Sequence, residues 1–245
     1  MGLNETEAFV LRTYKLAEAD KIILLLTRKA GLLRGVAHGA RKLKSRFGAS
    51  FELFTLVSLS YYEKETRELV SIRQAEILRS YFHLANKAEI VSALNYLSEL
   101  IVEFVPPHDP NEKLFRMIRA CLDTVAEAPA AAGEVVRYFE VWLLKLSGFL
   151  PDVRACAICR RQLQAEAFLS TDSTLQCNEC AQGVGLKLDA EAQARLRTLL
   201  SMPPDAWAQA GRNSSKETQQ QLAQLAHRLI AKALERTPRS QRTEG

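Results

Sequence analysis

The chain has 245 residues, of which 47% are hydrophobic and 25% are charged, and its formal net charge is +5. These proportions are ordinary for a globular protein and exclude wholesale disorder. The longest aliphatic run, Ile22–Leu26, is far shorter than the roughly 20 residues that a membrane-spanning helix needs. The first residues, MGLNETEAF, lack the basic and apolar regions of a signal peptide, so we expect a cytoplasmic protein with no membrane partner.

The positive charge is concentrated in the first third of the chain. Residues 1–80 contain 14 Lys and Arg against 9 Asp and Glu, whereas the remaining residues contain 19 of each sign. No acidic residue occurs between Asp20 and Glu52. This asymmetry predicts a module that binds a polyanion, joined to a part with no net charge.

The first 80 residues are predicted to form β-strands. Val57, Leu59 and Tyr61 alternate with more polar neighbours, a period of two that is typical of a strand with one buried face. Five short strands with a basic connection between the third and fourth predict a small barrel, for which an OB-fold is favoured and an SH3-like barrel is the alternative. The predicted strands are Glu7–Tyr14, Lys21–Thr27, Leu32–His38, residues 57–62 and Leu69–Ala75.

From about residue 81 the apolar residues recur at helical spacing. Pro106 and Pro107 should end the first long helix, and Asp109 followed by Pro110 should begin the next one. Two later helices are predicted near Asp189–Leu200 and Ser215–Glu235. The fold class is therefore α+β and multidomain. The expected domains are an OB-fold at 1–80, a helical domain at 81–155 and 181–238, an inserted module at 156–180, and a frayed tail at 239–245.

Four of the five cysteines form two CxxC pairs, CAIC and CNEC. Such pairs at this spacing indicate one zinc ion, because each turn directs two sulfurs at one point and four thiolates complete a tetrahedron. A closed set of four leaves no position for a substrate, so the Zn²⁺ would be structural. The alternatives are two disulfides, which a cytoplasmic chain disfavours, or unrelated thiols. The predicted ligands are Cys156, Cys159, Cys177 and Cys180; Cys121 lies in an apolar stripe and is expected in the core.

Common catalytic motifs are absent from the sequence. There is no GxxxxGK[ST] loop, no GxGxxG after a strand, no HExxH and no GxSxG. The four histidines are scattered, and none has a nucleophile nearby in sequence. A binding protein is therefore favoured over an enzyme.

The segment 34–47, RGVAHGARKLKSRF, ends the third predicted strand and enters a cationic connection. Glycines in and beside it allow close approach of a ligand to the backbone. Phe47 and Phe51, or Tyr61 and Tyr62, are candidates to stack on unpaired bases, unless these aromatic side chains belong to the core and the loop is only solvated. The cations that favour nucleic acid are Arg34, Arg41, Lys42, Lys44 and Arg46.

The order of these features resembles the RecO family of bacterial DNA repair and recombination mediators. The resemblance is carried by EAFVLRTYKLAEADKIILLLTRKAGLLRGVAHGARKLKSRF, SYYEKETRELVSIRQAEI, YLSEL, RYFEVWLLKLSGFLPDV and the CxxC pairs that follow. Together these segments extend over most of residues 7–190. Some members of the family lack the cysteines, so the zinc prediction depends on this chain's own CAIC and CNEC.

The resemblance implies an N-terminal OB-fold, a helical domain and an inserted zinc module. It also implies a protein that binds single- and double-stranded DNA without sequence preference and anneals complementary strands. Its implied partners are RecR, the acidic C-terminal tail of single-stranded DNA-binding protein and, indirectly, RecA, in the cytoplasm at the nucleoid. Carried over to matching positions, the five cations named above become DNA contacts.

Two other interpretations stay open on the sequence alone. The chain could be a zinc-containing scaffold whose basic loop binds an acidic partner. It could also be a zinc-ribbon enzyme that modifies RNA or catalyses hydrolysis, although no residue stands out as its acid or base.

Overall fold

The computed structural model describes residues 2–63, 68–212 and 214–241 and divides into two compact units, residues 1–119 and 120–245. The first unit contains a β-barrel, helix α1 (Ala88–Phe104) and the first part of helix α2 (Glu112–Glu127). The second contains the rest of α2, the later helices and a small sheet. Among the described residues, no helix is both long enough and apolar enough to cross a bilayer.

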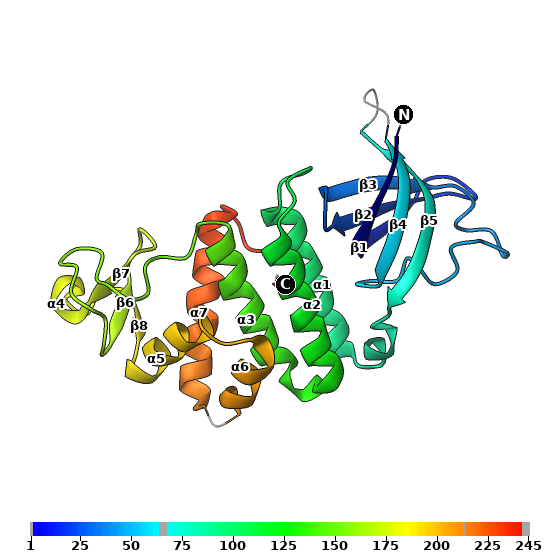
Figure 1. Cartoon of the computed structure of the whole chain (residues 1–245). Coiled ribbons are helices and arrows are strands. Elements are labelled where there is room, and N and C mark those ends of the chain that lie inside the picture. Colours follow the sequence, from blue (N-terminus) through cyan, green and yellow to red (C-terminus); the bar gives the residue numbers. More distant parts are fainter. Residues whose placement is uncertain (1, 64–67, 213, 242–245) are drawn as a thin grey trace. The chain divides into compact units, whose positions relative to one another are not determined.

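Five strands close the barrel in the order β1-β2-β3-β5-β4 (Figure 1). All neighbouring pairs are antiparallel except β3 and β5, which pair in parallel at Gly35 and Val70. This is the strand order of an OB-fold, and the predicted fold class is confirmed. The strands are β1 (Gly2–Lys15), β2 (Lys21–Thr27), β3 (Gly31–Ala37), β4 (Leu56–Glu63) and β5 (Val70–Arg79).

Alternate residues of each strand fill the barrel. Val57, Leu59 and Tyr61 of β4 are buried there, as their period of two predicts. In β1 the alternation is interrupted by a bulge between Val10 and Arg12, which changes the side of the strand on which the following residues lie.

One part of the barrel's outer surface is covered by helical residues of the same unit. The rings of Phe9 on β1 and Phe115 on α2 lie 4.8 Å apart, and both side chains are buried. The Ser98 hydroxyl of α1 donates a hydrogen bond of 2.9 Å to the carbonyl of Leu11. At Gly31, whose φ is +64°, an added Cβ would lie 2.5 Å from the backbone of Asp109, so only glycine fits between strand and connection.

The helix boundaries differ slightly from those predicted. Helix α1 ends at Phe104, before the two prolines, as expected. At the start of α2, however, the side chain of Asn111 accepts a hydrogen bond of 3.0 Å from the Leu114 amide, so Asn111 occupies the capping position assigned to Asp109. The sequence did not decide the start of this helix, because Asp109 and Asn111 of the segment DPNE are equally good capping residues.

Helix α6 (Pro204–Gly211), in the second unit, was missing from the prediction. It is only eight residues long, but it carries the buried Trp207, whose indole donates a 3.2 Å hydrogen bond to the carbonyl of Glu134. Ser215 caps α7 by accepting a hydrogen bond from the Thr218 amide. The remaining long helices are α3 (Ala132–Leu146), α5 (Ala190–Leu199) and α7 (Lys216–Ala233).

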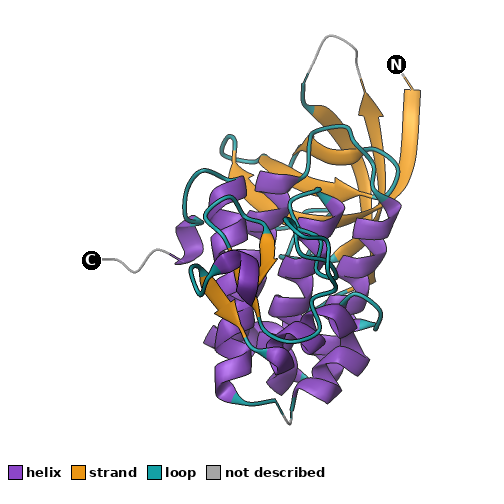
Figure 2. Cartoon of the chain, turned by 90° about the vertical axis from the view of Figure 1, so that its left-hand side faces the viewer, coloured by secondary structure: helices purple, strands orange, loops and turns teal. Residues whose placement is uncertain are grey.

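The cysteine module, residues 153–188, is mostly loop, teal in Figure 2. Its three-stranded sheet has the order β7-β6-β8, formed by β7 (Leu175–Cys177), β6 (Ala167–Leu169) and β8 (Leu186–Leu188). One short helix, α4 (Asn178–Ala181), follows directly on Cys177 and contains Cys180 of the second CxxC pair. The predicted domain limits stay a prediction, and residues 242–245 of the predicted tail lie outside the described residues.

Candidate nucleic-acid interface and cysteine cluster

The basic loop, residues 38–55, joins β3 to β4 through consecutive turns. Backbone amides donate to carbonyls three residues earlier at several points along it, for example from Lys42 to Gly39 and from Ser45 to Lys42. Hydrogen bonds of this kind define β-turns, so the loop has a folded backbone although it contains no helix or strand.

Aromatic side chains attach the second half of this loop to the barrel. Phe47, Phe51 and Phe54 are each at most 5% exposed, and the rings of Phe47 and Phe51 lie 4.9 Å apart. The Ser50 hydroxyl donates a 2.8 Å hydrogen bond to the carbonyl of Ala75 on β5. Phe47, Phe51 and the 4% exposed Tyr61 are therefore core residues, and the idea that they stack on bases is wrong.

The first half of the loop is held by the β1–β2 turn. The Asp20 carboxylate accepts a 2.8 Å hydrogen bond from the Gly39 amide and lies 2.7 Å from the His38 ring nitrogen Nδ1. These two contacts lower the pKa of Asp20, the Gly39 hydrogen bond most strongly. Arg41 donates through its amide to the Ala19 carbonyl at 2.9 Å and through its guanidinium to the Ala17 carbonyl at 2.7 Å.

The five predicted DNA-contacting cations are all exposed, but their settings differ. Arg34 lies on β3, whereas the other four follow closely in the loop. The Arg41 guanidinium also supports the β1–β2 turn, and that of Arg46 lies 4.9 Å from the centre of the Phe47 ring. Within the described part of the chain, the side chains of Arg34, Lys42 and Lys44 make no hydrogen bond or ion pair. Lys42 and Lys44 lie in the loop itself and are therefore the positions chosen for substitution, although the charge of Lys42 also helps to lower the pKa of Asp20.

The strand register places two further residues, Arg12 and Tyr14, on the same face as Arg34, and the sequence alone did not reveal them. Arg12 of β1 and Arg34 of β3 lie on either side of Leu24 of β2 and pair with it. In the next row, Tyr14 and Val36 both pair with Ile22 of β2. Residues in one row of a sheet share a face, so Arg12 and Tyr14 lie on the outer face with Arg34. The Tyr14 side chain is 43% exposed. Because the bulge after Val10 sets this register, strict alternation along β1 could not reveal it.

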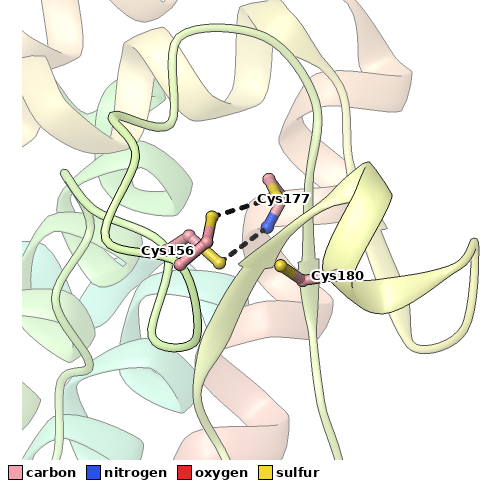
Figure 3. A group of neighbouring side chains, drawn as sticks. Cys156, Cys177 and Cys180 are labelled. Carbon is pink, nitrogen blue, oxygen red and sulfur yellow. Dashed lines mark hydrogen bonds between the residues drawn. The ribbon is translucent and has the colours of Figure 1, made fainter.

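The four cysteines of the two CxxC pairs come together in the cysteine module. Their sulfur atoms all lie within 4.8 Å of one another, and Figure 3 shows Cys156, Cys177 and Cys180 around a common point. The first pair lies on the loop before β6, and the second spans the end of β7 and helix α4. Arg160 and Gln182, which follow the two pairs, have left-handed φ angles of 64° and 52° that close the two turns.

The donor set fits a tetrahedral metal site and does not fit disulfides. The Sγ atoms of Cys159 and Cys177 are 3.8 Å apart, far longer than the roughly 2.05 Å of a disulfide bond. A tetrahedral zinc ion with Zn–S bonds of about 2.3 Å requires sulfurs about 3.8 Å apart. The cluster can therefore hold a metal ion.

The backbone also favours thiolate at this position. Burial alone would raise the pKa of Cys156, but amide groups of Cys159, Cys177 and Ile158 point at its sulfur and lower the pKa to about 6. The Cys177 amide lies 3.4 Å from that sulfur. Thiolate is the form that binds metal, so the surroundings of this sulfur suit a ligand.

Polar contacts attach the cysteine module to helix α5 within the second unit. The buried Gln193 donates a 2.7 Å hydrogen bond to the carbonyl of Val153, and Arg197 donates to the carbonyl of Leu163. Arg161 forms an exposed ion pair of 2.8 Å with Glu179, which links the two knuckles. Cys121 is buried elsewhere in the helical part, where burial raises its pKa, as expected for a core residue.

Two family models match almost the whole chain. Residues 1–81 match the recombination protein O N-terminal model, and residues 86–242 match the C-terminal model.

Curated relatives give the same result. The chain is 31% identical to "DNA repair protein RecO" of Koribacter versatilis over 95% of this chain and 96% of the relative. The protein of the same name from Pelobacter propionicus is 31% identical over 86% of this chain and 88% of its own length. That of a Synechococcus species is 35% identical over 69% of this chain and 60% of its own length. With the OB barrel, the helical part and the cysteine cluster in place, the chain belongs to the RecO family of DNA repair proteins.

Proposed function

We propose that this protein is a noncatalytic recombination mediator that binds single- and double-stranded DNA through its basic loop. It anneals complementary strands and, with RecR, helps to load RecA on strands coated by single-stranded DNA-binding protein. Family membership supports the repair role. The observation that carries the site is the exposure of Arg34 on β3 and of Arg41, Lys42, Lys44 and Arg46 on the folded loop that follows it.

Binding through phosphates explains annealing without sequence preference. Two strands repel each other through their phosphates, and cations that neutralise this charge leave the base edges free to pair. If the five cations each neutralise one phosphate, the logarithm of the affinity for a single strand should fall with a slope of about −3.5 against log salt. Affinity should then fall by roughly a hundredfold between about 50 and about 200 mM salt.

We further propose that Cys156, Cys159, Cys177 and Cys180 hold one structural Zn²⁺. The ion would supply folding free energy to a module that otherwise has only short strands. Because four thiolates close the coordination shell, it would take no part in a reaction.

The proposed protein partners are RecR and the acidic tail of single-stranded DNA-binding protein, with RecA engaged indirectly. We propose that the protein works in the cytoplasm at the nucleoid. An acidic tail and a phosphate backbone are both polyanions, so both could bind the basic loop. Tight binding of the acidic tail through this loop together with little affinity for oligonucleotides would favour the scaffold interpretation over the mediator.

A strand-annealing assay with and without single-stranded DNA-binding protein tests the proposal. The variant Lys42→Glu/Lys44→Glu changes the charge by about −4 and breaks no side-chain hydrogen bond or ion pair within the described part of the chain, although it removes the attraction of Lys42 for Asp20. It should anneal poorly, and thermal denaturation checks that it folds. The matched control Arg228→Glu/Lys232→Glu makes the same charge change on exposed residues of α7 and should anneal normally. Undiminished annealing by the loop variant would rule out the loop as the DNA site.

A further inference from the structure

Leu43 is the most exposed large apolar side chain among the described residues. Its exposure is 102% of the reference value, and the next in order, Val184, reaches 74%. Single exposed apolar residues are common on proteins and usually need no explanation. Leu43 differs from them in the charge around it and in the way its loop is held.

The local backbone places Leu43 at the corner of a turn. The Ser45 amide donates a 3.0 Å hydrogen bond to the Lys42 carbonyl, so Leu43 and Lys44 occupy the two central positions of this turn. Lys42 and Lys44, both exposed, directly flank the leucine in sequence. An apolar tip is thereby presented between two cations.

Both sides of this turn are attached to the barrel. On one side the Arg41 amide donates to Ala19, and on the other Phe47 is 2% exposed and packs on Phe51. A tip held in this way loses little conformational freedom when it binds. The exposed leucine is thus a preorganised feature of the loop.

From this arrangement we infer that Leu43 inserts between neighbouring bases of DNA whose phosphates are held by the adjacent lysines. This inference rests on the proposed DNA-binding function. An apolar side chain gains by leaving water, and bases that have been parted offer it an apolar slot. The cost is the loss of stacking at one base step, which is smallest where the DNA is already single-stranded or mismatched.

Two consequences follow from insertion by Leu43. The protein favours single strands over perfect duplex, because the duplex resists unstacking more strongly. The bound strand also has one step opened beside the loop, with its base edges facing away from the phosphates and free to pair.

Fluorescence of a single-stranded oligonucleotide containing 2-aminopurine tests the inference, because this base brightens when it is unstacked. The full-length protein should increase the fluorescence, and Leu43→Ala should remove the increase. The same variant should bind the strand about fivefold more weakly with an unchanged salt slope, since it loses apolar contact and no phosphate contact. Leu43→Met should restore both signals.

Leu78→Ala is the matched control, because Leu78 is 51% exposed on β5 and lies outside the loop. It should behave like the wild type. The inference is overturned if Leu43→Ala keeps the wild-type fluorescence and affinity, or if it weakens binding to anionic lipid vesicles and leaves DNA binding unchanged. If Lys42→Glu/Lys44→Glu abolishes binding while Leu43→Ala has no effect, the insertion fails and the DNA-binding function stands. If the wild type binds no oligonucleotide, both fail.

Discussion

The basic loop is built of turns and the cysteine module mostly of irregular loop, and the two regions are held in place by different interactions. The loop buries Phe47 and Phe51 in the barrel core, packs Phe54 against Phe9 and hydrogen-bonds to a neighbouring turn. The module converges on four sulfurs within 4.8 Å of one another. We propose that the loop, held by apolar side chains, folds before its ligand arrives, whereas the module, built around thiolates, depends on a metal ion.

Removal of the metal should produce the largest difference between the two regions in their protection from amide hydrogen exchange. Structural zinc contributes about 10–16 kcal/mol of apparent binding free energy in zinc-finger peptides. Chelation, or Cys159→Ser, should therefore abolish protection from amide hydrogen exchange across residues 156–188 and leave the barrel protected. Cys121→Ala, which removes a cysteine outside the cluster, should retain one zinc per chain. Purified protein with no zinc and with exchange indifferent to a chelator would contradict the account.

A truncated aromatic anchor should affect the loop and spare the module. Phe51→Ala removes a buried ring and should lower the free energy of unfolding of the first unit by about 3–5 kcal/mol. Thermal denaturation with and without chelator separates this loss from that of the metal site. Single-stranded DNA should also bind more weakly, because the cations lose their fixed positions. Equal stability of the variant and the wild type would show that the loop has another anchor.

Acid should release the first half of the loop from Asp20, and its effect on stability should be smaller than that of the two changes above. The Gly39 amide and then His38 lower the pKa of Asp20, so the stability from this contact is present above the unfolded pKa of aspartate and is lost as the pH falls through the lowered value. The amide resonance of Gly39 followed by NMR should titrate with a midpoint below the ordinary pKa of an aspartate, and Asp20→Asn should remove the transition. A midpoint at or above the ordinary pKa of an aspartate would mean that the contact is absent in solution.

Residues with a strong local signal could be predicted from the sequence. The alternation of Val57, Leu59 and Tyr61 identified a barrel strand, and the spacing of CAIC and CNEC identified a converging cluster. Tyr61 also shows the limit, because the alternation that buries it should have excluded it as a stacking residue.

Other features depend on contacts that are distant in sequence. The side of the strand on which Tyr14 lies follows from a bulge after Val10, and the buried state of Phe47 follows from the path of the whole loop. Neither is encoded by neighbouring residues. The exposure of Leu43 likewise required the fold, since an isolated leucine in a sequence is usually a core residue.

The salt dependence of single-stranded DNA binding tests the central claim most directly. The wild type should give a slope of about −3.5, and Lys42→Ala/Lys44→Ala should reduce its magnitude by about 1.4, because each phosphate contact contributes about 0.7. Arg228→Ala/Lys232→Ala, on the exposed face of α7, should leave the slope unchanged. Equal slopes for the wild type and the loop variant would contradict the assignment of the basic loop as the DNA site.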